Sequence, residues 1–152
     1  MATVSHVESP FNSTTGYGQT SPRCDDVPGG MMAAMLDTAV KNISSSDVWE
    51  ALSMPAGAVV TEVGIGVITA EGGTITVDVG ITGGATDGFL DGVSLNATAG
   101  ICHNSLNAAT AADTHSAGYY FASADTIDVL FNNAMDAGKF VIWCKYFLTN
   151  LN

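Results

Sequence analysis

The clearest alternation of hydrophobic and polar positions lies in the middle of the chain, in residues 74–81. Ile75, Val77, Val79 and Ile81 alternate there with Thr, Asp or Gly. A period of two places these four side chains on one face of a β-strand, and that face is expected to be buried. The pattern therefore predicts antiparallel β-structure at the centre of the fold.

A second run rich in β-branched residues, residues 58–69, precedes this strand, and Gly72 and Gly73 lie between the two runs. Two strand-forming runs on either side of a Gly-Gly turn are typical of a β-hairpin. We therefore expect residues 58–69 and 74–81 to pair with each other, with Gly72 and Gly73 as structural turn residues.

The other apolar runs are short and are separated by turn residues, which indicates further strands. We expect these strands at residues 31–40, 47–53, 93–99, 117–122, 126–131 and 139–149. Residues 31–36 also have good helix propensity, but the run is short and follows two glycines. With the central pair this makes about eight strands and an all-β chain, which suits an antiparallel, jelly-roll-like β-sandwich. Residues 100–118 are expected to form a long exposed loop.

The first thirty residues differ from the rest of the chain, because they hold three of its four prolines. Their apolar residues are spaced apart in a way that a purely disordered linker would not need. We expect an extended N-terminal arm, residues 1–30, followed by the sandwich domain, residues 31–152. The residues expected to bind a partner are Val4, Val7, Phe11 and Tyr17.

The composition narrows the range of partners. The net charge is −11, from 15 acidic residues against four Lys and Arg, and charged residues make up only 12% of the chain. That share is about half the usual one, and a surface so poor in charge favours burial against other proteins. Nucleic acids and anionic membranes bind clustered basic residues, so we expect the chain to bind neither.

The cysteines and the N-terminus indicate where the chain folds. Cys24, Cys102 and Cys144 are an odd, widely spaced set. We interpret them as reduced residues of a protein folded in a cytosol. The first residues lack the charged start and apolar core of a secretory signal, and no apolar run reaches membrane-spanning length.

Four residues after the central strand raise the question of a metal ion. Asp87, Gly88, Asp91 and Gly92, with Asp78 nearby in sequence, include oxygen ligands that suit calcium. The spacing of an EF-hand is missing, and Asp and Gly are the residues that turns need in any case. We interpret Asp87, Gly88, Asp91 and Gly92 as structural turn residues and expect no metal and no cofactor.

Two further sets have the residue types of reactive sites. Cys102, His103 and His115 include soft metal ligands but lack the paired spacing of zinc sites. Asp113, His115 and Ser116 have the residue types of a hydrolytic triad, without the strand-turn-helix motif that presents a nucleophile. We therefore expect no enzymatic activity.

Aromatic residues gather in two of the predicted strands. They favour a β-sheet core, although a sugar-stacking platform is the alternative. These residues are Tyr119, Tyr120, Phe121, Trp143, Tyr146 and Phe147.

Several turn motifs occur together in a fixed order. They are Pro55-Ala56-Gly57, residues 69–74 (TAEGGT), residues 87–92 (DGFLDG), residues 124–128 (ADTID) and residues 136–139 (DAGK). In this order they resemble small virion structural proteins of tailed bacteriophages, which in cyanophages include capsid cement and decoration proteins. The resemblance covers about residues 47–149 and rests on structural turns, with no catalytic residue among them.

The resemblance implies a capsid cement protein with a β-sandwich body. Such a protein folds in the cytoplasm of the host bacterium and ends on the outer capsid surface of the virion. There it binds the major capsid protein, bridges neighbouring subunits and forms a homotrimer. The alternative is a receptor- or glycan-binding domain of a phage tail fibre or appendage.

Overall fold

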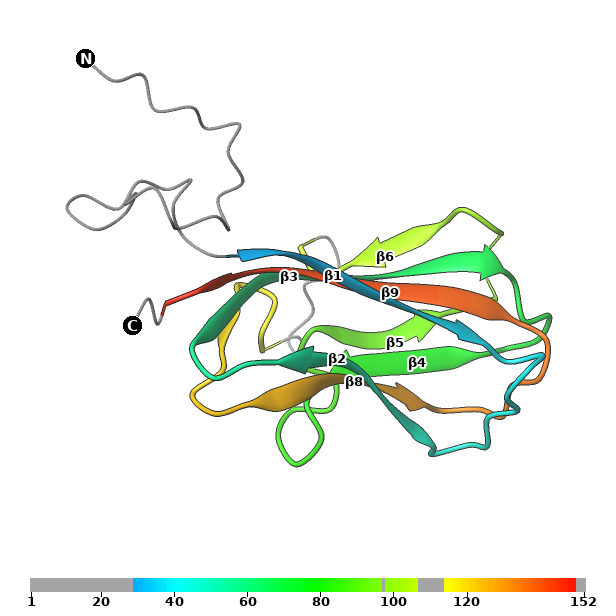
Figure 1. Ribbon diagram of the computed structural model, residues 1–152. Coiled ribbons are helices and arrows are strands. Elements are labelled where there is room, and N and C mark those ends of the chain that lie inside the picture. Colours follow the sequence, from blue (N-terminus) through cyan, green and yellow to red (C-terminus); the bar gives the residue numbers. More distant parts are fainter. Residues whose placement is uncertain (1–28, 97, 107–113, 150–152) are drawn as a thin grey trace, which may run out of the picture.

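The computed structural model describes residues 29–96, 98–106 and 114–149. These residues contain nine strands and no helix, and they form two antiparallel sheets that face each other (Figure 1). Consistent with this, no helix in the described residues has the length and apolarity needed to cross a membrane. The predicted arm residues Val4, Val7, Phe11 and Tyr17 lie outside the described residues.

The first sheet holds five strands. In spatial order they are β1 (Gly29–Asp37), β9 (Lys139–Leu148), β3 (Ala58–Thr69) and β6 (Cys102–Asn104), with β7 (Tyr119–Tyr120) paired to the other end of β3. The second sheet holds four strands. In spatial order they are β2 (Val48–Met54), β8 (Asp125–Phe131), β4 (Thr76–Gly80) and β5 (Leu90–Ser94).

Apart from the two-residue strand β7, the chain follows jelly-roll order: successive strands alternate between the sheets, except that β4 and β5 are neighbours in the second sheet. The first sheet is arranged β1-β9-β3-β6 and the second β2-β8-β4-β5, and every pairing is antiparallel. Figure 1 shows the two sheets as an upper and a lower layer. The predicted all-β sandwich of jelly-roll type is confirmed.

The core lies between the sheets and is built by the alternation that the sequence predicts. Ile75, Val77, Val79 and Ile81 are all buried, as expected. The facing residues of β3 are buried as well, and they are Ala58, Val60, Val63, Ile65 and Val67. Burying a branched aliphatic side chain contributes about 1.5–3 kcal/mol, so these two strands supply much of the stability.

The predicted hairpin between residues 58–69 and 74–81 is wrong. β3 and β4 belong to different sheets, and the residues between them, including Gly72 and Gly73, carry the chain from one layer to the other. Gly72 has a φ of 80°, which a glycine adopts without strain. Two strand-forming runs around a Gly-Gly pair are compatible with a crossover as well as with a hairpin.

Glu71 holds this crossover in place. Its carboxylate accepts hydrogen bonds from the backbone N–H groups of Asp136 (2.7 Å) and Ala137 (3.0 Å), from that of Gly138, and from the Thr38 hydroxyl (3.0 Å). Burial alone would raise the pKa of Glu71, but these hydrogen bonds outweigh it and lower the pKa. One side chain therefore ties the crossover to the ends of β1 and β9.

The other differences from the predicted strands are local. β6 lies inside the predicted loop 100–118, because three residues with no apolar alternation carry no strand signal. β1 begins at Gly29, so the last two residues of the predicted arm belong to the sandwich. Asp91 and Gly92 lie inside β5 as a bulge opposite Asp78, rather than in the preceding loop. Gly92 has a φ of 58°, and its N–H donates to Oδ1 of Asp78 over 2.7 Å.

Candidate functional site

The outward side of the first sheet is unusually apolar. Ile142 and Cys144 of β9 are buried in the core, so the alternating residues Val141 and Trp143 point away from it. Neither of these two residues packs against the core cluster. β9 is therefore apolar on both of its faces, although only one face is needed to build the sandwich.

The register of the sheet places further apolar residues beside these two. Trp143 lies between Ala33 of β1 and Gly64 of β3, and a Cβ on Gly64 would overlap the indole ring. The missing side chain therefore lets the ring lie flat on β3. In the next row, Val141 lies between Met35 of β1 and Gly66 of β3, whose neighbour on β6 is Cys102.

An aromatic row closes one end of this surface. Phe147 of β9 lies beside Val59 of β3, which pairs in turn with Tyr120 of β7. Tyr120 is 51% exposed and Phe147 is 37% exposed, whereas Met31 and Met35 at the β1 edge exceed 60%. We call this surface the neutral face. Its apolar members are Met31, Ala33, Met35, Val59, Cys102, Tyr120, Val141, Trp143 and Phe147.

The charges on the neutral face cancel. Lys145 pairs with Glu62 over 2.6 Å, and Lys139 pairs with Asp37 over 2.7 Å. Two ammonium groups thus face two carboxylates. The hydrogen bond from Lys145 lowers the pKa of Glu62, and the hydrogen bond from Lys139 lowers the pKa of Asp37, so both carboxylates stay ionised.

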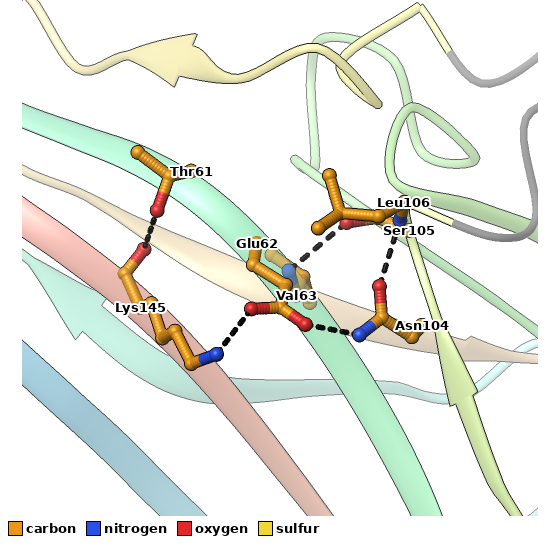
Figure 2. A network of polar contacts seen from close by, with 7 residues as sticks. All are labelled: Thr61, Glu62, Val63, Asn104, Ser105, Leu106 and Lys145. Carbon is orange, nitrogen blue, oxygen red and sulfur yellow. Dashed lines mark hydrogen bonds and ion pairs between the residues drawn. The ribbon is translucent and has the colours of Figure 1, made fainter.

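A polar network fixes the β6 side of the neutral face, and Figure 2 shows it from close by. The Glu62 carboxylate receives Lys145 on one side and the Asn104 amide on the other. Asn104 Oδ1 accepts the Leu106 N–H over 2.7 Å, and the Ser105 hydroxyl accepts the Val63 N–H over 3.1 Å. These contacts tie the short strand β6 to β3 and so fix the position of β6 at this edge of the neutral face.

The outward side of the second sheet has the opposite character. β2, β8, β4 and β5 contain no Lys or Arg. Their outward positions carry four carboxylates, which we call the acidic face: Glu50, Asp78, Asp91 and Asp128. Asp128 is buried and the other three reach the surface, so this side of the sandwich is negative and its four strands hold no basic residue to offset the charge.

The predicted turn residues Asp87 and Gly88 lie in the loop that joins β4 and β5 of the second sheet. Gly88 is buried against the His115 ring, and its carbonyl accepts the His115 N–H over 2.7 Å. Asp87 lies in the same turn, two residues before the buried Phe89. The described residues contain no group of three or more His, Cys, Asp or Glu side chains placed to hold a metal ion.

The histidines considered for zinc binding and hydrolysis have structural neighbours of their own. His115 packs against Phe89 and Tyr119, with ring centroids 5.4 and 4.2 Å apart. His103 lies on β6, and its Nε2 is 3.0 Å from the Ser94 carbonyl oxygen. Asp113, the third residue of the candidate triad, lies outside the described residues. Ring packing accounts for His115 without any chemistry.

The aromatic residues divide between core and surface. Tyr119, Phe121 and Tyr146 pack in or against the core, as expected from strand aromatics. Tyr120, Trp143 and Phe147 do not, and they lie on the neutral face. One feature of the sequence could have indicated this surface. Residues 31–36 and 140–144 are apolar at consecutive positions, whereas a strand with one solvent-exposed face alternates apolar and polar residues.

No protein-family model and no curated protein matches the sequence. Solved structures do match the fold. A chain in the capsid of Ralstonia phage GP4 superposes with a TM-score of 0.58 at 16% identity, over 86% of this chain and 92% of that one. A chain of the cyanophage Pam1 capsid asymmetric unit superposes with a TM-score of 0.55 at 20% identity, over 81% and 85%. The sandwich therefore has the fold of chains found in phage capsids, as the resemblance implied.

Proposed function

We propose that this chain is a capsid cement protein of a bacteriophage, bound to the outer surface of the shell through its neutral face. The observation that carries the proposal is an apolar, charge-cancelled sheet face on a chain whose fold recurs in phage capsids. In this role the protein bridges neighbouring major capsid subunits. The virion is then its site of action, after folding in the cytoplasm of the host.

The chemistry of the neutral face supports a protein partner. Interface cores are poor in unpaired charge and rich in aromatic residues and Met, and this face has both properties. β9 has ten residues and lies between β1 and β3, which gives a surface of about 34 Å by about 14 Å, and the short strands β6 and β7 extend it on one side. Together that is roughly 550 Å², somewhat less than the about 800 Å² that each partner buries in a standard interface.

The acidic face supports the orientation. If the neutral face lies on the shell, the acidic face points to solvent, where water solvates the three carboxylates that reach the surface, Glu50, Asp78 and Asp91, and screens their repulsion. The reverse orientation would press these three carboxylates into an interface. A chain of net charge −11 is also repelled by packaged DNA, so the outer surface of the shell suits it better than the inner one.

The N-terminal arm extends the same proposal. We expect its apolar residues, Val4, Val7, Phe11 and Tyr17, to bind a neighbouring capsid subunit. The arm joins the sandwich at Gly29, in the strand that forms one edge of the neutral face. Twenty-eight extended residues reach at most about 95 Å, which is ample for a neighbouring subunit. Deleting residues 1–28 should weaken capsid binding and leave the sandwich folded; unchanged binding would contradict this part of the proposal.

Self-association as a homotrimer is part of the proposed role. A trimer joined to three capsid subunits holds on by several weak contacts at once, and avidity then exceeds any single affinity. Light scattering of the purified protein, with and without shell fragments, measures this directly. A monomer under both conditions would remove the trimer from the proposal and leave single-site binding.

The function itself is tested on virions stripped of this protein. Stripped particles should release DNA at a lower temperature than intact ones, because the interface buried by each copy no longer opposes shell opening. Adding back the purified wild-type protein should restore the release temperature. Equal release temperatures for stripped and intact particles would contradict a cement role.

A second candidate function is a receptor- or glycan-binding domain of a phage tail fibre or appendage. The exposed Tyr120 and Phe147 and the half-buried Trp143 favour it, because rings on a flat sheet face stack against sugars. A glycan array would separate the two functions. Micromolar binding that is lost in Trp143→Ala, with no affinity for shells, would favour this alternative over cement.

A further inference from the structure

Asp128 is a buried carboxylate with an unsatisfied oxygen. The residue is 4% exposed, and its Oδ1 has no hydrogen-bond partner in the described part of the chain. Its other oxygen, Oδ2, accepts the Thr82 N–H over 2.9 Å. A buried carboxylate normally has a full set of donors or a cation nearby, because an uncompensated charge away from water is costly.

A second carboxylate lies directly opposite. The register of the second sheet pairs Asp128 of β8 with Glu50 of β2, on the same outward side. Directly opposed residues of an antiparallel pair have Cβ atoms about 4.5–5.5 Å apart, and like charges there are destabilising. The four strands of this sheet contain no Lys or Arg that could compensate the pair.

The backbone of a loop lies on the other side of Asp128. Its partner on β4 is Gly80, and the loop of residues 81–89 folds over that glycine. A Cβ on Gly80 would overlap the carbonyl oxygens of Ala85 and Thr86. The absent side chain therefore brings the backbone of this loop beside Asp128. The Ala85 oxygen already accepts two backbone N–H groups, over 2.9 and 3.2 Å, so the Thr86 oxygen is the uncharged ligand that the loop offers to the two carboxylates.

We propose that Asp128, Glu50 and the Thr86 carbonyl oxygen bind a calcium ion. The site shares no residue with Asp87 and Asp91, which the sequence raised as calcium ligands, and it does not depend on the proposed cement function. The ion neutralises the opposed carboxylates, supplies the partner that Asp128 Oδ1 lacks, and ties the loop to β8 and β2.

The donor set selects the class of cation. All of its donors are oxygen atoms, and zinc prefers the nitrogen and sulfur donors that are missing from this set. Calcium tolerates irregular coordination and completes its shell with water, whereas magnesium requires near-ideal octahedral geometry. Two carboxylates make a weak site, for which a dissociation constant of about 0.1–1 mM is expected.

Thermal unfolding of the full-length protein tests the site. Protein freed of metal by a chelator is unfolded in buffer of physiological ionic strength at increasing Ca²⁺. At about 10 mM Ca²⁺ we expect the melting temperature to rise by about 5 °C, because the ion binds the folded state alone. Mg²⁺ at the same concentration should give a clearly smaller rise.

Variants separate this site from general attraction of Ca²⁺ to an acidic protein. Asp128→Asn keeps the shape of the side chain and should abolish the Ca²⁺-dependent rise, and the exposed Glu50→Gln should reduce it by at least half. Asp78→Asn is the matched control, because this carboxylate lies on the same face but already accepts hydrogen bonds from Gly92 and Asn132. The control should keep the full rise.

A direct measurement guards against misfolded variants. Tb³⁺ replaces Ca²⁺ in oxygen sites, and Trp49 precedes Glu50 in β2, so excitation of tryptophan should give Tb³⁺ luminescence that Ca²⁺ suppresses. The inference is overturned by the absence of a Ca²⁺ response in the wild type. A response of unchanged size in both Asp128→Asn and Glu50→Gln overturns it as well.

Discussion

The two outward faces of this sandwich come from sheets of similar size and have opposite chemistry. On the neutral face, the apolar residues Val141 and Trp143 alternate with the buried core residues of β9, and the charged residues form ion pairs. On the acidic face, carboxylates such as Asp78 and Asp128 alternate strictly with core residues. Strict alternation is what a sheet with one wet face requires, so the two-sided apolar character of β9 needs a different cause, which we assign to a protein partner.

On each face a glycine lets other atoms of the protein approach the strand closely, but the approaching atoms differ. Gly64 makes room for the ring of Trp143, which is a side chain at the surface. Gly80 makes room for the backbone of Ala85 and Thr86 in the loop over β4. The neutral face is thereby kept flat and open, whereas part of the acidic face is covered by the protein itself.

The largest expected effect is on capsid binding. Trp143→Asp places an unpaired charge in the centre of the neutral face and should weaken binding to stripped shells at least about 100-fold, since desolvating that charge is costly and an aromatic anchor is lost. Leu130→Asp makes the same kind of change on the acidic face and should alter affinity less than about twofold. Sedimentation of labelled protein with shells measures both. Equal losses would contradict the assignment of the two faces.

The two glycines give the next largest effect, on stability. Gly80→Ala should lower the free energy of unfolding by about 2–3 kcal/mol, because the backbone of the loop has to move. Gly64→Ala should lower it by about 1 kcal/mol, because the Trp143 ring can swing into solvent. Urea unfolding of both variants tests the order. A larger loss of stability in Gly64→Ala than in Gly80→Ala would mean that the Trp143 ring cannot move aside.

Removing one carboxylate from each face should affect stability differently. Glu62→Gln breaks the partly exposed pair with Lys145 and should lower the free energy of unfolding by about 0.5–1 kcal/mol at pH 7. In chelator, Glu50→Gln relieves repulsion with Asp128 and should leave stability equal or slightly higher. Destabilisation by both variants would remove this contrast between the faces.

The contribution of Glu62 should also depend on pH. Its pKa is lower in the folded chain than in the unfolded one, because Lys145 donates a hydrogen bond to the ionised form. The stabilisation is therefore present above the usual glutamate pKa of about 4.3 and is lost as the pH falls through the lower folded value. The difference between wild type and Glu62→Gln should vanish in that acid range, which unfolding at several pH values would show.

The smallest expected effect is that of salt on capsid affinity. An interface on the neutral face carries no net charge, so raising NaCl from about 50 to about 500 mM should change affinity less than about threefold. An interface on the acidic face would respond much more strongly. Binding isotherms at several salt concentrations distinguish the two.

Much of the fold follows from the sequence, and the reasons for the failures are specific. The alternation at Ile75, Val77 and Val79 gives the buried face of β4 correctly, since burial of every second side chain is a local property. The partner of β4 is a long-range property, so Gly72 and Gly73 could not tell a hairpin from a crossover held by Glu71. The three-residue strand β6 leaves no periodic signal at all.

The candidate surface was harder to predict than the fold. Trp143 and Phe147 read as core aromatics, because a strand sequence alone does not say which side faces the second sheet. The burial of Ile142 and Cys144 in the structure shows that Trp143 lies outward, and the register places it beside Gly64. The opposed carboxylates of Glu50 and Asp128 were likewise invisible, since 77 residues separate them in sequence and only the pairing of β2 with β8 brings them together.

The most direct test of the neutral face as the docking surface is the thiol reactivity of Cys102. This residue lies on that face and is exposed, whereas Cys144 is buried and burial raises its pKa to about 11, so it stays silent. In a Cys24→Ser background, Cys102 should react with a thiol reagent freely in solution and at least about tenfold more slowly once the protein is bound to the shell. An unchanged rate in the bound state would contradict the account.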